Sequence, residues 1–302
     1  MPKSLGSNTK QSAVKLQDGL MRLTAPNPSP MTYTGTNTYI LGRKELAIID
    51  PGPNSEIHLR NILEVIPPNG AVTHILVTHS HMDHSELAPI LSKILKVPTF
   101  AFGTALDGQS NNMKNICKMG LISESIGIDT EFVPDYFLRD KQKIISSDWE
   151  IVAHHTPGHL CNHICYQYFD NLFTGDHVME WSTSVISPPE GDLSQFINSC
   201  KEINKLRCEQ FYPGHGLPVE NPNERIAELI MHRKKREIEI QNFLINREAT
   251  IAQITKNVYL DIDQSLLSVA SRNVKAHLVD LIIKKQVKVD DISSDNAIFS
   301  LV

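Results

Sequence analysis

Residues 73–84 read THILVTHSHMDH, a short apolar run followed by three histidines and an aspartate within six positions. The apolar half predicts a buried β-strand, and the polar half predicts the loop that follows it. In an extended loop, residues two apart point the same way, so His79 and His81 can converge on one ion. Asp83 and His84 come at the turn into the next helix and can serve a second ion. Imidazole and carboxylate are suitable ligands for Zn²⁺.

The same arrangement recurs further along the chain. Short apolar runs end in turns rich in glycine and proline, and these turns carry His159 in TPGH, Asp176 in TGD and His215 in PGHG. Each of these signals is weak alone, because histidine and aspartate are common in solvated turns. Together with residues 79–84 they complete two coordination shells, presented on loops at the ends of strands.

This series of motifs resembles the one that defines the metallo-β-lactamase superfamily, in the same order across roughly residues 14–222. The resemblance implies an α+β fold, an αββα sandwich with metal ions at one edge. It implies two zinc ions, with manganese or iron as alternatives. The implied ligands are His79, His81 and His159 for one ion, Asp83, His84 and His215 for the other, and Asp176 between them. Asp50, in IIDPG, is implied to hydrogen-bond around the histidine loop from behind the ligands.

Such a site implies a binuclear hydrolase that uses a metal-bridging hydroxide against phosphorus or a carbonyl carbon. Two Zn²⁺ ions, two ligand carboxylates and one hydroxide leave a net charge of about +1, which favours anionic substrates or transition states. The candidate catalytic carboxylates are Asp83, Asp50 and Asp176. Asp83 and Asp50 are alternatives for relaying a proton.

After Pro222 the pattern becomes helical. The expected order is a long helix, a short helix, one or two further helices and a hairpin, at residues 223–246, 250–258, 264–286 and 287–302. Helices followed by a hairpin are typical of a winged-helix module. We therefore predict a catalytic domain at residues 1–222, and a long helix plus winged-helix domain at residues 223–302.

The resemblance continues into this tail. Residues 35–39 (GTNTY), residues 187–189 (SPP), the pair His232-Arg233 and the winged-helix order are similar to β-lactamase-like endoribonucleases of mitochondria and their bacterial relatives. This implies hydrolysis of phosphodiesters in single-stranded RNA. On this interpretation the basic cluster HRKKR at residues 232–236 contacts phosphates. The alternative is a solvated helix face.

Two other classes of function stay open. One is a glyoxalase II-like hydrolase of small thioesters or esters, although residues 85–89 (SELAP) lack the glycine pair common in that group. The other is a non-enzymatic winged-helix regulator with a metal-binding sensor domain, which the near-neutral tail disfavours. The winged helix would then mediate a homodimer or cover the active site. Antibiotic hydrolysis is disfavoured, because the members that perform it carry cysteine where this chain has Asp176.

Composition narrows the setting. The 302 residues carry a net charge of -5, so nothing in the overall charge points to nucleic acid. Five cysteines at scattered spacing argue against a disulfide framework and for a reducing, cytoplasmic compartment. Residues 1–25 show no signal-peptide pattern, and no run reaches the roughly 20 apolar residues of a membrane helix. We therefore expect a cytoplasmic enzyme acting on RNA or on a small anionic or thioester substrate, with no membrane partner.

Overall fold

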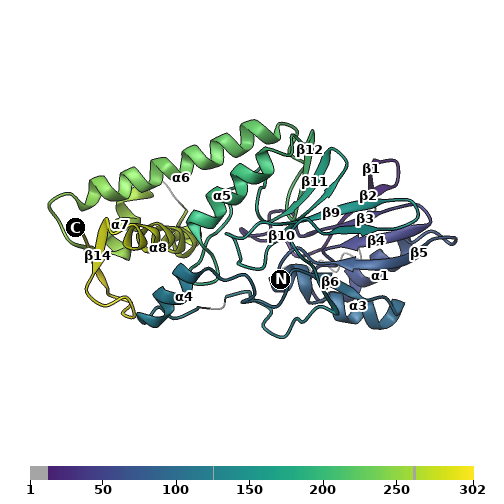
Figure 1. Ribbon diagram of the computed structural model, residues 1–302, viewed down its shortest axis with the longest axis horizontal. Helices are drawn as coiled ribbons and strands as arrows, with labels where there is room; N and C mark the ends of the chain where they lie inside the picture. Colours follow the sequence, from purple (N-terminus) through teal and green to yellow (C-terminus); the bar gives the residue numbers. More distant parts are fainter. Residues whose placement is uncertain (1–12, 125, 261–262) are drawn as a thin grey trace, which may run out of the picture.

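The computed structural model describes residues 13–124, 126–260 and 263–302 (Figure 1). Two β-sheets stack face to face, and helices cover both outer faces. A smaller helical region with its own three-stranded sheet follows at the C-terminal end. The predicted αββα sandwich with a C-terminal winged helix is confirmed.

The first sheet has seven strands in the order β1-β2-β3-β4-β5-β6-β7. They span Val14–Gln17, Leu20–Thr24, Asn37–Leu41, Glu45–Ile49, Ala71–Leu76, Thr99–Ala101 and Tyr136–Phe137. Strands β1 to β4 pair antiparallel, whereas β4 to β7 pair parallel. Parallel neighbours need crossover connections. Helices supply them: α1 at Glu56–Val65, α2 and α3 at Met82–Ser85 and Ala88–Leu95, and α4 at Asn111–Lys118.

The second sheet has five strands in the order β12-β11-β10-β9-β8. They span, from β8 to β12, Lys143–Ile145, Glu150–His155, Ile164–Tyr168, Asn171–Gly175 and Gln210–Pro213. Only the β11–β12 pair is parallel, and α5 at Leu193–Asn204 makes its crossover. The side chain of Asp192 caps α5 by accepting from the backbone N–H of Gln195, as the sequence predicted.

Side-chain alternation along the strands builds the layers. On β3, Tyr39 and Leu41 pack between the two sheets, while Ile40 faces the helices on the outer side. On β4, Ile49 and Ile48 divide in the same way. Because strands of this kind are buried on both faces, they appear in the sequence as continuous apolar runs. Each such side chain stabilises the fold by about 1.5–3 kcal/mol through burial.

The C-terminal region begins with the long helix α6, Pro222–Leu244, which lies along α5 in Figure 1. Then follow β13, α7, a 3₁₀ turn, α8, β14 and β15, at Ala249–Thr250, Ile251–Val258, Gln264–Leu266, Leu267–Ile283, Val287–Val289 and Ile298–Leu301. The last two strands form the predicted hairpin. The first half of α6 shares a core with α5, and its second half shares one with α7 and α8. The predicted domain boundary between residues 222 and 223 stays a prediction.

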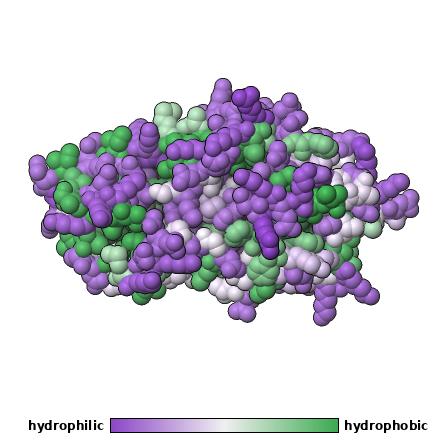
Figure 2. Space-filling view, viewed as in Figure 1, coloured by the Kyte–Doolittle hydropathy of each residue, from purple (hydrophilic) through white to green (hydrophobic). Residues whose placement is uncertain are grey.

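Helix α8 docks the C-terminal region onto the sandwich. Its Val279 packs with Met113 and Ile116 of α4, and the Ser194 hydroxyl of α5 donates to Asp280 at 2.6 Å. The face in Figure 2 is mostly hydrophilic, with small hydrophobic groups over the C-terminal elements at its left end. None of the helices in the described ranges is long and apolar enough to cross a bilayer. All five cysteines are free.

Candidate metal centre

The candidate ligands gather at one edge of the sandwich. Asp50 follows β4, the 79–84 loop follows β5, Asp176 follows β11 and His215 follows β12. These strands form two parallel pairs, so within each pair the carboxyl ends lie at the same edge of the sheet. His159 comes from the loop between β9 and β10. A β-bridge between Thr36 and His215 joins the edges of the two sheets.

The first ligand group, called here the three-histidine group, comprises His79, His81 and His159. The Nδ1 atom of His81 lies 2.9 Å from Nε2 of His79 and 3.0 Å from Nε2 of His159. With an oxygen of Asp176, these atoms all lie within 4.8 Å of one another. A tetrahedral zinc ion with bonds of about 2.0–2.1 Å holds its ligand atoms about 3.3 Å apart, so the group fits such an ion after small shifts.

The second ligand group, called here the mixed group, comprises Asp83, His84 and His215. The two imidazole Nε2 atoms lie 3.4 Å apart. Oδ2 of Asp83 lies 3.5 Å from Nε2 of His84 and 3.4 Å from Nε2 of His215. These separations also match the ligand spacing of a small divalent cation.

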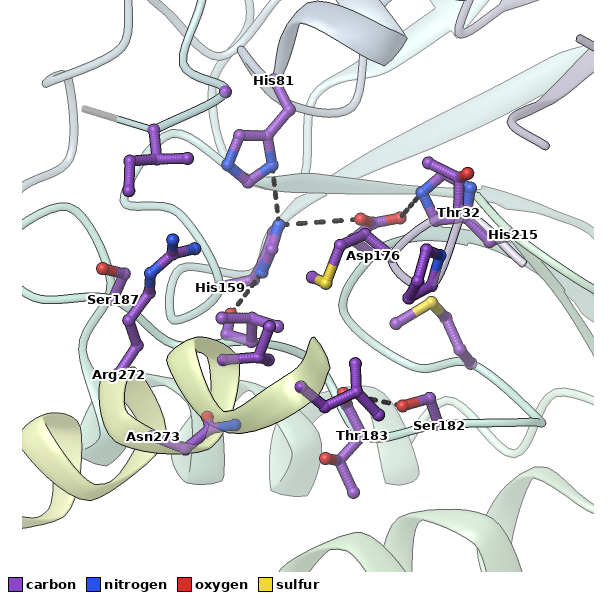
Figure 3. Close-up of a pocket in the computed structure, with 18 of the residues that line it drawn as sticks. Thr32, His81, His159, Asp176, Ser182, Thr183, Ser187, His215, Arg272 and Asn273 are labelled. Atoms are coloured by element: carbon purple, nitrogen blue, oxygen red, sulfur yellow. Dashed lines mark hydrogen bonds and ion pairs between the residues drawn. The ribbon is translucent and has the colours of Figure 1, made fainter. Parts of the chain in front are cut away.

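Asp176 lies between the two groups, with one carboxylate oxygen toward each (Figure 3). Its Oδ1 is 3.3 Å from Nε2 of His215 and 3.4 Å from Nε2 of His84. Its Oδ2 is 3.8 Å from Nε2 of His159 and 4.0 Å from Nε2 of His79. The side chain therefore has the placement that a carboxylate shared by two ions requires.

Asp50 lies behind the ligands. Its carboxylate accepts from the backbone N–H and the hydroxyl of Thr78, at 2.7 and 2.8 Å, and lies 2.9 Å from Nδ1 of His84. Only 2 % of Asp50 is exposed, and its φ of 51° turns the chain directly after β4. Asp83 lines a cavity that opens beside the ligands and is described below, whereas Asp50 does not line it. The proton-relay role of either carboxylate stays a prediction.

Three other ligand histidines also contact groups outside the centre through their Nδ1 atoms. Nδ1 of His79 lies 2.9 Å from the Thr78 hydroxyl, and Nδ1 of His159 donates to the carbonyl of Val185 at 2.6 Å. Nδ1 of His215 lies 3.3 Å from the carbonyl of Gly35. Partners of this kind fix the tautomer and the ring orientation of a ligand histidine. They leave Nε2 of these rings free to point at the centre.

The two groups differ in charge. Burial lowers the pKa of His79 well below its usual value, that of His81 to about 3, and that of His159 as well. Burial acts the same way on His84 and His215, but the nearby carboxylates outweigh it and raise both pKa values. The three-histidine group is therefore neutral and ready to donate to a metal. In the mixed group a metal must displace protons.

The donor set fits a pair of divalent ions. Imidazole nitrogens and carboxylate oxygens converge from both sides, and the intervening Oδ1 of Asp176 is buried without a well-formed hydrogen bond. A buried acceptor left in this state costs roughly 1–3 kcal/mol, which a bound cation would remove. These His and Asp groups could therefore bind metal ions.

A cavity of about 370 Å³ opens beside the ligands. One wall carries ligands from both groups, and the opposite wall comes from α8, with Arg272 and Asn273 labelled in Figure 3. The winged-helix region thus covers the site, one of the two roles expected for it. The apolar part of the lining includes Met31, Ile128, Leu160, Met179, Trp181 and Val269. The sequence motifs did not reveal this wall, because its residues come from elements that meet only in the folded chain.

The basic cluster at residues 232–236 does not form one exposed surface. Arg233 is buried and its guanidinium donates to the side chain of Asn273. Arg236 lies over the ring of Tyr259 at 4.4 Å and pairs with Glu239. Only the two lysines are exposed. The interpretation of the whole cluster as a phosphate contact is therefore wrong for Arg233, because this side chain lies on the face of α6 that packs against the rest of the protein.

The comparisons agree with this fold and site. The family profile described as "Metallo-beta-lactamase superfamily" matches residues 31–215, and the one described as "Beta-lactamase associated winged helix domain" matches residues 250–294. The fold and the site define a hydrolase with a histidine- and aspartate-rich centre under a winged helix. The chain belongs to the metallo-β-lactamase superfamily.

Individual proteins match over nearly the whole chain. "Beta-lactamase-like protein 2 homolog" of Caenorhabditis elegans is 30 % identical over 285 residues, which are 91 % of this chain and 86 % of that protein. "Atrochrysone carboxyl ACP thioesterase" of Passalora fulva is 24 % identical, over 90 % of this chain and 76 % of that protein. A metallo-beta-lactamase family protein from Thermus thermophilus superposes with a TM-score of 0.76 at 19 % identity, covering 95 % of this chain and all of that one. The last similarity concerns the fold.

Proposed function

We propose that this chain is a binuclear hydrolase that holds zinc in both ligand groups, with manganese or iron as alternatives. The observation that carries the proposal is Asp176, whose two oxygens point to different groups. Three imidazoles on one side, and two imidazoles with a carboxylate on the other, are a donor set that suits zinc.

Two bound ions would supply Lewis acidity and a hydroxide nucleophile at neutral pH. The chain's own side chains prepare the site for this chemistry. Asp50 and Thr78 hold the imidazoles of both groups in one orientation. Asp83 stands at the cavity wall, where the Thr36 hydroxyl donates to it at 2.8 Å. From there its carboxylate can accept a proton from the attacking water and pass it to the leaving group of a substrate in the cavity.

For the substrate, we place a phosphodiester of single-stranded RNA first. The full-length similarity, winged helix included, to relatives of the "Beta-lactamase-like protein 2" kind supports this choice. So does the aromatic edge of the cavity, where Trp181 stacks on Tyr33 with ring centroids 5.0 Å apart. Tyr33 is 50 % exposed, so an unpaired base can extend the stack. Arg272, which lines the opposite wall and lies 3.6 Å from the carboxylate of Glu124 through its Nε, brings a guanidinium that a phosphate could engage.

A thioester is the second candidate, and a different observation favours it. Most of the cavity lining away from the ligands is apolar, which suits the body of an acyl group. One relative over nine-tenths of the chain is named as a thioesterase. The same centre would then act on a carbonyl carbon and stabilise its oxyanion.

A winged-helix regulator without enzymatic activity is disfavoured by the position of α8. A helix that reads DNA must enter the major groove with one face free. Helix α8 instead buries nine of its residues, and it packs against α4, α5, α6 and α7. The helix that would read DNA is therefore already covered.

One experiment separates the two substrate classes. The purified chain is loaded with zinc, its metal content is measured, and end-labelled single-stranded RNA and an acyl-glutathione thioester are assayed in parallel. Asp176→Ala removes the shared carboxylate. Asp170→Ala is the matched control, because Asp170 is an exposed turn residue. RNA cleavage by the wild type and the control, but not by Asp176→Ala, is the expected result.

Other outcomes are equally decisive. RNA cleavage that persists in Asp176→Ala would identify a contaminating nuclease and overturn the RNA proposal. Thioester turnover without RNA cleavage would establish the second candidate. Two bound metals with neither activity would overturn both substrate proposals.

A further inference from the structure

Residues 182–187, between β11 and α5, connect the ligands to the C-terminal helices; we call them the support loop. The hydroxyl of Ser184 in this loop donates to the backbone carbonyls of Asp176 and His177. The carbonyl of Val185 accepts from Nδ1 of His159 at 2.6 Å. The shared carboxylate and one member of the three-histidine group therefore both depend on where this loop lies.

Two side chains from the C-terminal helices hold the support loop from its other side. Arg233 of α6 donates through Nη2 to the carbonyl of Ser184, and through Nη1 to Oδ1 of Asn273 at 3.0 Å. The same Oδ1 of Asn273, on α8, accepts from the backbone N–H of Ile186 at 3.3 Å. Arg233 is 1 % exposed and Asn273 is 7 % exposed, so both side chains are largely shielded from solvent.

The use of a buried arginine here is informative. In the described part of the chain no carboxylate pairs with Arg233, and the groups that accept its hydrogen bonds are neutral. Burying an unpaired cation is unfavourable, and an apolar side chain of similar volume would pack at lower cost. The guanidinium also lies over the ring of Phe196, with its central carbon 5.5 Å from the ring centre. The geometry of its two donated hydrogen bonds is what an apolar residue could not supply.

We propose that Arg233 and Asn273 are positioning residues, which act through the support loop to place the imidazole of His159 and the carboxylate of Asp176. The C-terminal region then completes the metal centre as well as covering it. This inference rests on the proposed binuclear function, because its effect is on metal ligands. Outer contacts of this type typically change metal affinity by roughly 10–100-fold when they are removed.

The test uses the full chain loaded with Co²⁺, whose visible absorption reports the geometry around the ion. Arg233→Met keeps most of the volume and removes both donated bonds. Arg236→Met is the matched control on the same helix, because Arg236 also lies over an aromatic ring but donates to Val258, away from the support loop. Affinity is measured by competition with a chelator, and thermal unfolding is recorded for each protein.

We expect Arg233→Met to alter the cobalt spectrum and to weaken metal binding by roughly 10–100-fold. Arg236→Met should lower the unfolding temperature and leave spectrum and affinity as in the wild type. Equal spectra and affinities in Arg233→Met and the wild type would overturn the inference and leave the proposed function standing. Equal losses in both variants would also overturn it, since they would report general loosening of α6.

A failure of Arg233→Met to fold does not end the test. Asn273→Ala removes the acceptor shared by Arg233 and Ile186 with a smaller change of volume, and the same two readouts decide. A wild-type chain that binds no Co²⁺ at all would overturn the proposed function itself, a result distinct from the others.

Discussion

The three-histidine group and the mixed group share Asp176 but are built differently. In the first, burial keeps the imidazoles of His79, His81 and His159 neutral. In the second, carboxylates surround His84 and His215 and favour their protonated forms. The difference indicates that a metal ion enters the three-histidine group without competition, whereas in the mixed group it replaces protons that already balance the carboxylates.

The supports of the two groups also differ. Asp50, directly after β4, and Gly35, just before β3, orient the imidazoles of the mixed group. The support loop, which the C-terminal helices hold, orients His159 of the three-histidine group. Loss of the Asp50 carboxylate should therefore act mainly on the mixed group, whereas displacement of the support loop should act on His159 and on the shared Asp176.

The largest effect is expected where the groups meet. Asp176→Ala removes an oxygen from each group, so both should lose affinity and kcat should fall by on the order of 10³-fold. Metal analysis after dialysis, together with the hydrolysis rate, checks this. A variant that retains a full metal content and more than a tenth of the activity would show that the groups do not share this carboxylate.

A smaller effect, mainly on the metal affinity of the mixed group, is expected from substitution of Asp50. Asp50→Ala removes the acceptor of His84 Nδ1–H. It should lower the metal affinity of the mixed group by roughly 10–100-fold. The three-histidine group should change less, because its link to Asp50 passes through the Thr78 hydroxyl. Stepwise metal titration followed by calorimetry resolves the two affinities. Equal weakening of both steps would contradict the separation of the groups.

The pH dependence of metal loading tests the same difference without mutation. The raised pKa values of His84 and His215 mean that protons compete with the metal as pH falls from neutral to mildly acidic, by about tenfold per pH unit for each displaced proton. The lowered pKa values in the three-histidine group remove that competition over the same range. Metal content is measured after equilibration at each pH. As pH falls, the ion in the mixed group should be released before the ion in the three-histidine group. Parallel release of both would be inconsistent with the pKa difference.

In the metal-free protein, the contributions of the two groups to the free energy of unfolding should change with pH in opposite directions. Histidines with lowered pKa values bind protons more readily when unfolded, so their contribution to stability is lost as pH drops below about 6.5. Histidines with raised pKa values stabilise the fold below their unfolded pKa, and this contribution is lost as pH rises through the folded value. Urea unfolding across pH, with His84→Ala as the comparison, measures the second contribution.

The smallest effect is expected at Thr36. Thr36→Val keeps the side-chain shape and removes the hydrogen bond that Thr36 donates to Asp83, a loss of about 0.5–1.5 kcal/mol, together with the one that Thr36 accepts from Asn27. This corresponds to a severalfold weaker metal affinity at the mixed group. The affinity of the three-histidine group should be unchanged in the same calorimetric titration. A change confined to the three-histidine group would be the opposite of this expectation.

Local patterns predicted many of the elements. Apolar runs and turn residues located β4, β5 and α5, and the Asp192 cap was found from its residue type alone. Strands β1, β2 and β3 and helix α4 were not predicted. These strands have four or five residues and mixed polarity, and α4 buries only Met113 and Ile116, so their patterns resemble loops. Their structure depends on pairing and packing with the rest of the chain.

The sequence by itself indicated which side chains gather at the centre, because most of these histidines and aspartates follow parallel strands, whose carboxyl ends share one edge of a sheet. Tertiary structure decided how Asp176 divides its oxygens, that Arg233 turns inward to the support loop, and that α8 forms the far wall of the cavity. Those features depend on the docking of α6 and α8 onto the sandwich. Docking is set by long-range apolar contacts, which no local pattern encodes.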